Sequence, residues 1–166
     1  MRKVLIACVG NIFLGDDGFG VEVARELAKR TLPAGVCLGE FGIRSYDLAY
    51  AMMEDWELII LVDAVPQGGK PGTVYVIEPD LAALNADEME APALDAHTMN
   101  PVAVLQLVRA LGGEVKRMLV VGCEPGPLSD EQGQIGLSGP VQAAVGEAVQ
   151  TLEELLRQPL AESAAA

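Results

Sequence analysis

Residues 4–20 read VLIACVGNIFLGDDGFG, and this stretch decides the fold. It begins with a continuous apolar run, Val4–Val9, and passes through a glycine-rich loop into the first helical pattern. Such runs are typical of parallel strands that are covered on both faces, and the chain repeats them at Leu58–Val62 and Met118–Val121. The three runs predict central parallel strands with helices between them.

The rest of the chain continues this alternation. Apolar spacing predicts four helices: one with Val21, Ala24, Leu27 and Ala28 on its buried face, one over Tyr46–Met53, one from Pro101 to a stop at Gly112-Gly113, and one that starts near Pro140. Two shorter strands are expected at Val36–Phe41 and Thr73–Ile77, the second near an edge of the sheet. The chain is therefore predicted to be a single-domain α/β protein with a doubly wound, mostly parallel five-stranded sheet and helices on both faces. We expect this domain to span residues 1–157 and residues 158–166 to form a disordered tail.

The composition indicates a folded, acidic protein. Of the 166 residues, 51% are hydrophobic and 21% are charged, which excludes intrinsic disorder. The formal net charge of -13 would repel a phosphate backbone, so nucleic acid is not an expected partner. No apolar run approaches the ~18 residues of a membrane-spanning helix, and the N-terminal run is too short for a signal peptide. We therefore expect no membrane insertion and a cytoplasmic protein, with Cys8, Cys37 and Cys123 as reduced thiols.

The loop at residues 10–20 does not match a nucleotide-binding motif. A phosphate loop would have a lysine after its glycine, but Asp16 follows Gly15. A dinucleotide fingerprint that begins at Gly18 would need a glycine at the position of Val23. The aspartates also put negative charge beside a helix N-terminus, where a phosphate would otherwise lie.

Three carboxylates near the expected carboxyl edge of the sheet are candidates for chemistry. Asp16 and Asp17 precede the first helix, and one of them can simply cap it while its neighbour points outward. Asp63 ends a predicted central strand, which is a typical position for a functional residue. The alternative for Asp63 is a capped turn that leads into Pro66.

His97 is the single histidine of the chain and lies just before the helix that starts at Pro101. A lone histidine is more often a surface or hydrogen-bonded residue than a ligand. Its loop can nevertheless reach the same edge of the sheet, so Asp17, Asp63 and His97 could converge from three segments. Two carboxylates and one imidazole would form an incomplete, open ligand set for Ni(II), Zn(II) or a similar ion.

Other candidates carry weaker signals. Cys8 and Cys123 follow the pattern of buried core thiols. Glu124 could line the site or simply close its strand. The segment Asp80–Asp95 is expected to be a solvated acidic loop, although its length also suits a mobile binding surface.

Taken together, these features resemble the hydrogenase maturation proteases, the nickel-dependent endopeptidases that remove the C-terminal extension of a [NiFe]-hydrogenase large-subunit precursor. The resemblance covers most of the chain and rests on these segments: Gly10-Asn11 with Gly15-Asp16-Asp17-Gly18-x-Gly20, the strand-terminal Asp63-Ala64, the His97 loop, and the late segment from Gly122 to Gly136-Leu137-Ser138. It implies a phosphorylase/hydrolase-like three-layer sandwich. The sequence departs from the family motif at Cys8, where the motif has a further glycine.

The resemblance also implies the roles of the site residues. In that family an acidic residue of the first loop, the strand-end aspartate and the loop histidine bind metal, which corresponds to Asp17, Asp63 and His97 as catalytic residues and metal ligands. Asp16 matches the preceding acidic residue. The implied enzyme is an aspartyl-type hydrolase without an organic cofactor, whose partner is a nickel-loaded precursor that brings the nickel with it. Either carboxylate could act as the general base, or the metal could lower the pKa of water.

The alternative function is a non-catalytic nickel-binding maturation chaperone that inspects or delivers nickel without cutting. A nucleotide-binding module on the same fold is disfavoured by the failed glycine motifs. Cleavage of the precursor would distinguish the endopeptidase from the chaperone.

Overall fold

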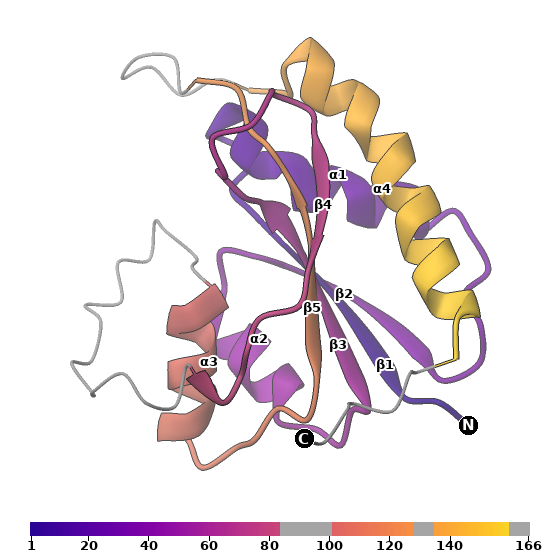
Figure 1. Ribbon diagram of the computed structural model, residues 1–166, viewed down its shortest axis with the longest axis vertical. Helices are drawn as coiled ribbons and strands as arrows, with labels where there is room; N and C mark the ends of the chain where they lie inside the picture. Colours follow the sequence, from indigo (N-terminus) through magenta and orange to yellow (C-terminus); the bar gives the residue numbers. More distant parts are fainter. Residues whose placement is uncertain (84–100, 128–134, 160–166) are drawn as a thin grey trace.

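The computed structural model describes residues 1–83, 101–127 and 135–159 (Figure 1). Strands and helices alternate along these ranges, as predicted. The elements are β1 (Val4–Val9), the 3-10 helix η1 (Gly15–Gly18), α1 (Phe19–Leu27), β2 (Val36–Gly42), α2 (Ser45–Met52), β3 (Leu58–Ala64), β4 (Val74–Ile77), α3 (Pro101–Ala110), β5 (Met118–Cys123) and α4 (Gly139–Arg157).

The strands form one five-stranded sheet in the order β2-β1-β3-β5-β4. All neighbouring pairs are parallel except β4, which runs antiparallel to β5 at an edge of the sheet. The three continuous apolar runs are the central strands β1, β3 and β5, because only a strand covered on both faces buries every side chain. The predicted doubly wound sheet is therefore confirmed. Its chain order reverses between β1 and β3, and the carboxyl ends of these two strands form the crevice where such folds bind their ligands.

Helices cover both faces of the sheet (Figure 1). α1 and α4 share one core cluster with alternate residues of β1, namely Val4, Ile6 and Cys8. α2 and α3 share the other cluster with the intervening residues of the same strand. Cys8, where the sequence departs from the family motif, is fully buried and pairs in register with Val62 of β3. The departure therefore leaves the pairing with β3 and the core packing regular, while the pairing of β1 with β2 shifts register between Cys8 and Val9.

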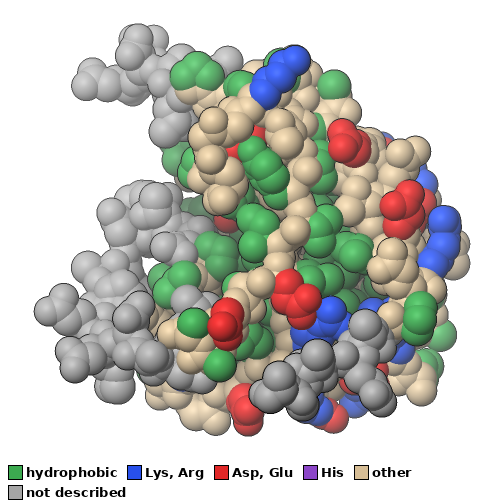
Figure 2. All heavy atoms as spheres, in the orientation of Figure 1, with side chains coloured by type: hydrophobic (Ala, Val, Ile, Leu, Met, Phe, Trp, Pro, Cys, Tyr) green, Lys and Arg blue, Asp and Glu red, His purple; other side chains and the backbone are tan. Residues whose placement is uncertain are grey.

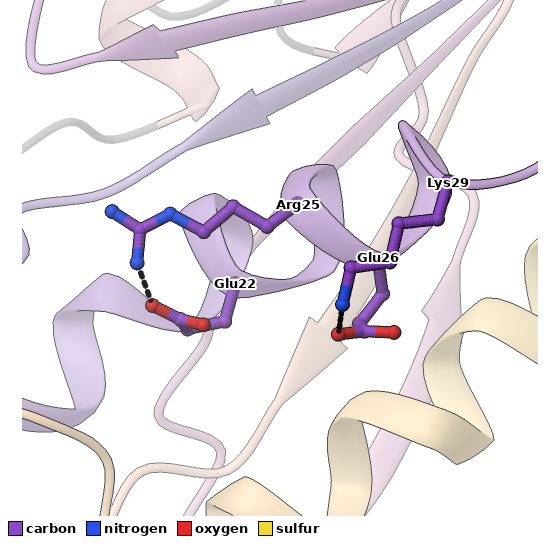
Figure 3. A network of polar contacts seen from close by, with 4 residues as sticks. All are labelled: Glu22, Arg25, Glu26 and Lys29. Atoms are coloured by element: carbon purple, nitrogen blue, oxygen red, sulfur yellow. Dashed lines mark hydrogen bonds and ion pairs between the residues drawn. The ribbon is translucent and has the colours of Figure 1, made fainter.

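The outer surfaces of the helices carry paired charges. Glu22 pairs with Arg25 on α1, and Glu26 at its C-terminal end pairs with Lys29 in the turn that follows (Figure 3). Acidic and basic side chains also lie close together along the right side of Figure 2, which is the side of α4 in Figure 1. Exposed pairs of this kind each contribute roughly 0.5 kcal/mol or less. The stability of the fold therefore comes mainly from its two apolar core layers.

Some details differ from the sequence predictions or lie beyond the described ranges. α1 ends at Leu27, so Ala28 is exposed rather than part of the buried helical face. α3 stops after Ala110, with Gly112 at a φ of 85°, as expected for a glycine stop. The following predictions fall outside the described residues: His97, the acidic segment from residue 84 to residue 95, and residues 160–166 of the tail. No helix in the described part of the chain has the length and apolar character needed to cross a bilayer.

Candidate active site

Asp17 lies in η1, between the end of β1 and the start of α1. Its side chain is half-buried, and Oδ2 accepts a hydrogen bond from the backbone N–H of Asn11 (2.9 Å). Burial raises the pKa of this carboxyl, while the hydrogen bond from Asn11 opposes the rise. The residues at the N-cap positions of η1 and α1 are Leu14 and Gly18, and neither helix has a side-chain cap. The helix-capping interpretation of the aspartates is therefore wrong.

Asp63 is the penultimate residue of β3 and is only 5% exposed. Its Oδ1 accepts a hydrogen bond from the backbone N–H of Ala64 (2.8 Å). Burial raises the pKa of Asp63 well above its ordinary value, and the nearby charge of Asp17 raises this pKa further. The structure thus brings the two carboxyls close enough to repel each other when both are ionised. A pair of this kind can share one proton or bind a cation.

Two glycines allow this approach of helix and sheet. A Cβ on Gly20 would lie 2.1 Å from the carbonyl oxygen of Val9 and 2.5 Å from that of Val62, so α1 starts directly against the ends of β1 and β3. Gly10 has a φ of +146°, and a Cβ there would lie 2.1 Å from the carbonyl oxygen of Asp17. The glycines of the first loop therefore place the Asp17 backbone tightly beside the sheet.

Asp16 has a different role from its neighbour. It is 8% exposed, and its Oδ1 accepts a hydrogen bond from the backbone N–H of Ser138 (2.7 Å). Its Oδ2 accepts hydrogen bonds from the Ser138 hydroxyl (2.8 Å) and from the backbone N–H of Gly126 (2.8 Å). These partners are 122 and 110 residues away along the chain, so no local signal in the sequence could have identified them. Asp16 thus joins η1 to the segments that follow β5 and precede α4.

The structure decides between the two roles predicted for Glu124. It directly follows β5, is 5% exposed, and accepts hydrogen bonds from the backbone N–H groups of Gln67 (2.7 Å) and Gly68 (3.1 Å). The Tyr75 hydroxyl also donates to it (2.9 Å). The hydrogen bond from Gln67 is the main reason that the pKa of Glu124 is lowered. This carboxylate closes the end of its strand and fixes the loop between β3 and β4.

The cysteines are all free thiols, and two of them belong to the core. Cys8 and Cys123 are fully buried, which confirms their predicted role as core thiols. Burial raises the pKa of both thiols, and together with the charge of Asp16 it raises that of Cys123 to about 11. Both thiols are therefore protonated at neutral pH and are poor nucleophiles. Cys37 is exposed on β2.

His97 lies outside the described residues, so its convergence with the two carboxyls stays a prediction. Within residues 1–83, 101–127 and 135–159, no three His, Cys, Asp or Glu side chains are grouped as they would be around a metal ion. The described part of the site therefore consists of the Asp17–Asp63 pair, and the hydrogen bonds of Asp16 fix the η1 backbone that carries Asp17.

Comparison with known proteins identifies the family. The HycI sequence model, described as hydrogenase maturation protease, matches residues 21–155. The hydrogenase expression/formation protein HupD of Rhodobacter capsulatus is 31% identical over 155 residues, which cover 91% of this chain and 71% of HupD. The hydrogenase maturating endopeptidase HybD from E. coli matches with a TM-score of 0.70 and 29% identity, over 95% of this chain and 93% of HybD. A hydrogenase 2 maturation peptidase from a Thaumarchaeota archaeon matches with a TM-score of 0.68 and 29% identity, over 94% of this chain and 99% of that one. The chain therefore belongs to the hydrogenase maturation protease family, and its activity is that of an endopeptidase.

Proposed function

We propose that the protein removes the C-terminal extension of a [NiFe]-hydrogenase large-subunit precursor after nickel insertion, and that Asp17, Asp63 and His97 carry out the reaction. The observation that carries the proposal is the pair of carboxyls at the carboxyl ends of β1 and β3, with Asp63 buried and Asp17 half-buried, where the charge of Asp17 opposes ionisation of Asp63. Family membership supplies the class of reaction, and the pair supplies the reactive groups at the crevice of the sheet.

Nickel is part of the substrate in this proposal, because it arrives already held by the precursor. Carboxylate oxygens and an imidazole nitrogen are ligands that first-row divalent ions accept. A cation would offset the repulsion between Asp17 and Asp63, which is the feature of the site that suits it. Three protein ligands would leave positions for the thiolates of the precursor, and shared binding would hold the nearby peptide bond beside the pair.

The same pair also suits an aspartyl-type mechanism. Burial and the charge of Asp17 favour a proton on Asp63, so Asp63 can donate a proton while Asp17 accepts one from water. This state and the cation-bound state are alternatives, because a bound cation would displace that proton. They predict different dependence on nickel.

The test is to incubate the protein separately with nickel-loaded and nickel-free precursor and to weigh the products by mass spectrometry. Cleavage of the loaded precursor alone is the expected result. Cleavage of both forms would support the aspartyl-type state without nickel gating. Binding of the precursor without a change in its mass would identify a nickel-binding chaperone instead.

Variants assign the reaction to the proposed residues. Asp17→Asn, Asp63→Asn and His97→Ala should each abolish cleavage while the circular dichroism spectrum stays that of the wild type. Asp55→Asn is the matched control, because Asp55 is an exposed carboxylate that pairs with Lys116 before the amino ends of β3 and β5, at the opposite end of these strands from Asp63. Near-normal cleavage by a folded variant would show that the replaced residue is structural.

A further inference from the structure

An exposed apolar turn lies directly beside the candidate active site. Ile12, Phe13 and Leu14 follow one another between β1 and η1, and 38%, 63% and 40% of their respective surfaces are exposed. Apolar side chains scattered singly over a surface need no explanation, but three in succession on one turn indicate an interaction site. We call residues 11–17 the apolar turn.

The apolar turn is held in shape by its own hydrogen bonds. The Asn11 side-chain oxygen accepts from the backbone N–H of Phe13 (2.9 Å), and the Asn11 carbonyl accepts from that of Leu14 (3.1 Å). The Leu14 carbonyl in turn accepts from the backbone N–H of Asp17 (3.2 Å). These bonds fix the backbone that displays the side chains, so a partner that covers them does not have to order the loop first.

The carboxylate that closes the apolar turn is also half of the candidate catalytic pair. Asp17 accepts the hydrogen bond from the Asn11 N–H, and its charge raises the pKa of Asp63. Phe13 therefore belongs to the same short turn as one carboxyl of the pair. Residues 11–15 carry no charged side chain, so the turn offers apolar contact in a protein whose net charge is -13.

We propose that the apolar turn is the docking surface for an apolar segment of the precursor polypeptide beside the bond that is cut, with Phe13 as its main contact. The proposal rests on the function proposed above. A polypeptide substrate has to lie across the Asp17–Asp63 pair during cleavage, and the apolar turn continues directly from that pair. A second copy of the protease on the same turn would cover the pair and exclude the substrate.

The first test compares Phe13→Ser with Val76→Ser. Val76 is also an exposed apolar residue (48%). It lies on the edge strand β4, which is separated in the sheet by β3 and β5 from β1, the strand that leads into the apolar turn. Burying much of a phenylalanine ring against a partner changes affinity by about tenfold or more. We therefore expect Phe13→Ser to raise KM for the precursor about tenfold or more with an unchanged melting temperature. Phe13→Leu keeps an apolar side chain, so its KM should stay close to that of the wild type. The Val76→Ser control should cleave like the wild type. An unchanged KM in folded Phe13→Ser would overturn the proposal.

The second test identifies what lies on the turn. Phe13→p-benzoylphenylalanine, in the full chain, is irradiated in the presence of the precursor, with Val76→p-benzoylphenylalanine as the control. A covalent adduct with the C-terminal region of the precursor, formed only from position 13, is the expected result. An adduct between two protease chains, or equal labelling from both positions, would overturn the proposal. This test does not depend on cleavage, so a wild-type protein that fails to cut would count against the proposed function while the adduct still decides the docking surface.

Discussion

Replacing Asp16 with alanine should lower the free energy of unfolding by about 2 kcal/mol or more. The change removes the acceptor of two part-buried backbone N–H groups, those of Ser138 and Gly126. A fully buried donor left without a partner costs about 1–3 kcal/mol, and the lower end of this range applies to each of these part-buried donors. The Ser138 hydroxyl can rotate toward another partner, so it adds little. Since domains of this size are stable by about 5–15 kcal/mol in total, the loss would be a large part of the whole.

Urea denaturation followed by tryptophan fluorescence measures this loss. The single tryptophan, Trp56, donates a hydrogen bond to the Ala51 carbonyl (2.7 Å) and packs with the α2–α3 layer, away from Asp16. A lower midpoint at an unchanged slope would therefore report the stability of the whole domain. The control is Ser138→Ala, which keeps both backbone donors bonded to Asp16 and should cost about 1 kcal/mol. If Asp16→Ala cost no more than this control, the two backbone hydrogen bonds would not stabilise the fold and the reasoning would be refuted.

Four further outcomes are expected. Gly20→Ala should cost about 3 kcal/mol or more in thermal unfolding, because the added Cβ would meet the carbonyl oxygens of Val9 and Val62. Gly146→Ala in α4, where nothing lies within 4 Å, should instead gain about 1 kcal/mol. The folded-state pKa of Asp63 is raised, so its stabilising contribution is complete below the unfolded-state pKa and is lost as pH rises through the folded-state pKa. Asp63→Asn should therefore be more stable than the wild type at neutral pH and match it in acid, as measured by urea titration with a chelator; equal stability at both pH values would contradict the assigned shift. Calorimetry should show weak nickel binding to the free protein, because its proposed ligand set is incomplete; tight binding without precursor would argue against a shared site.

The sequence predicts the sheet well because burial on both faces imposes a pattern that is visible locally. Val4–Val9, Leu58–Val62 and Met118–Val121 are apolar without interruption, and a strand of this kind is stable only between neighbours and under helices. Right-handed crossovers between parallel strands explain why helices cover both faces, whereas the order β2-β1-β3-β5-β4 could not be read from the apolar runs. Asp63 was recognisable for the same reason, because an acid at the end of such a run lies at the carboxyl edge of the sheet.

The division of labour between Asp16 and Asp17 could not be predicted in this way. The two residues are adjacent and chemically identical, and only their partners distinguish them. Those of Asp16 lie beyond residue 125, whereas Asp17 bonds to its own turn and faces Asp63. The role of Glu124 was open for a similar reason, since the nearest hydrogen-bond partner of its carboxylate is 49 residues away.

The hydrogen bonds of Asp16 also constrain the order in which parts of the chain can fold. They join the first turn of the chain to Gly126 and Ser138, and contacts between such distant residues require a long loop to close first. On the ribosome, the turn that carries Asp17 emerges well before the residues that support it. The turn acquires its native surroundings only when β5 and α4 have packed, so a nascent or half-folded chain does not present a finished proteolytic site to the rest of the cell.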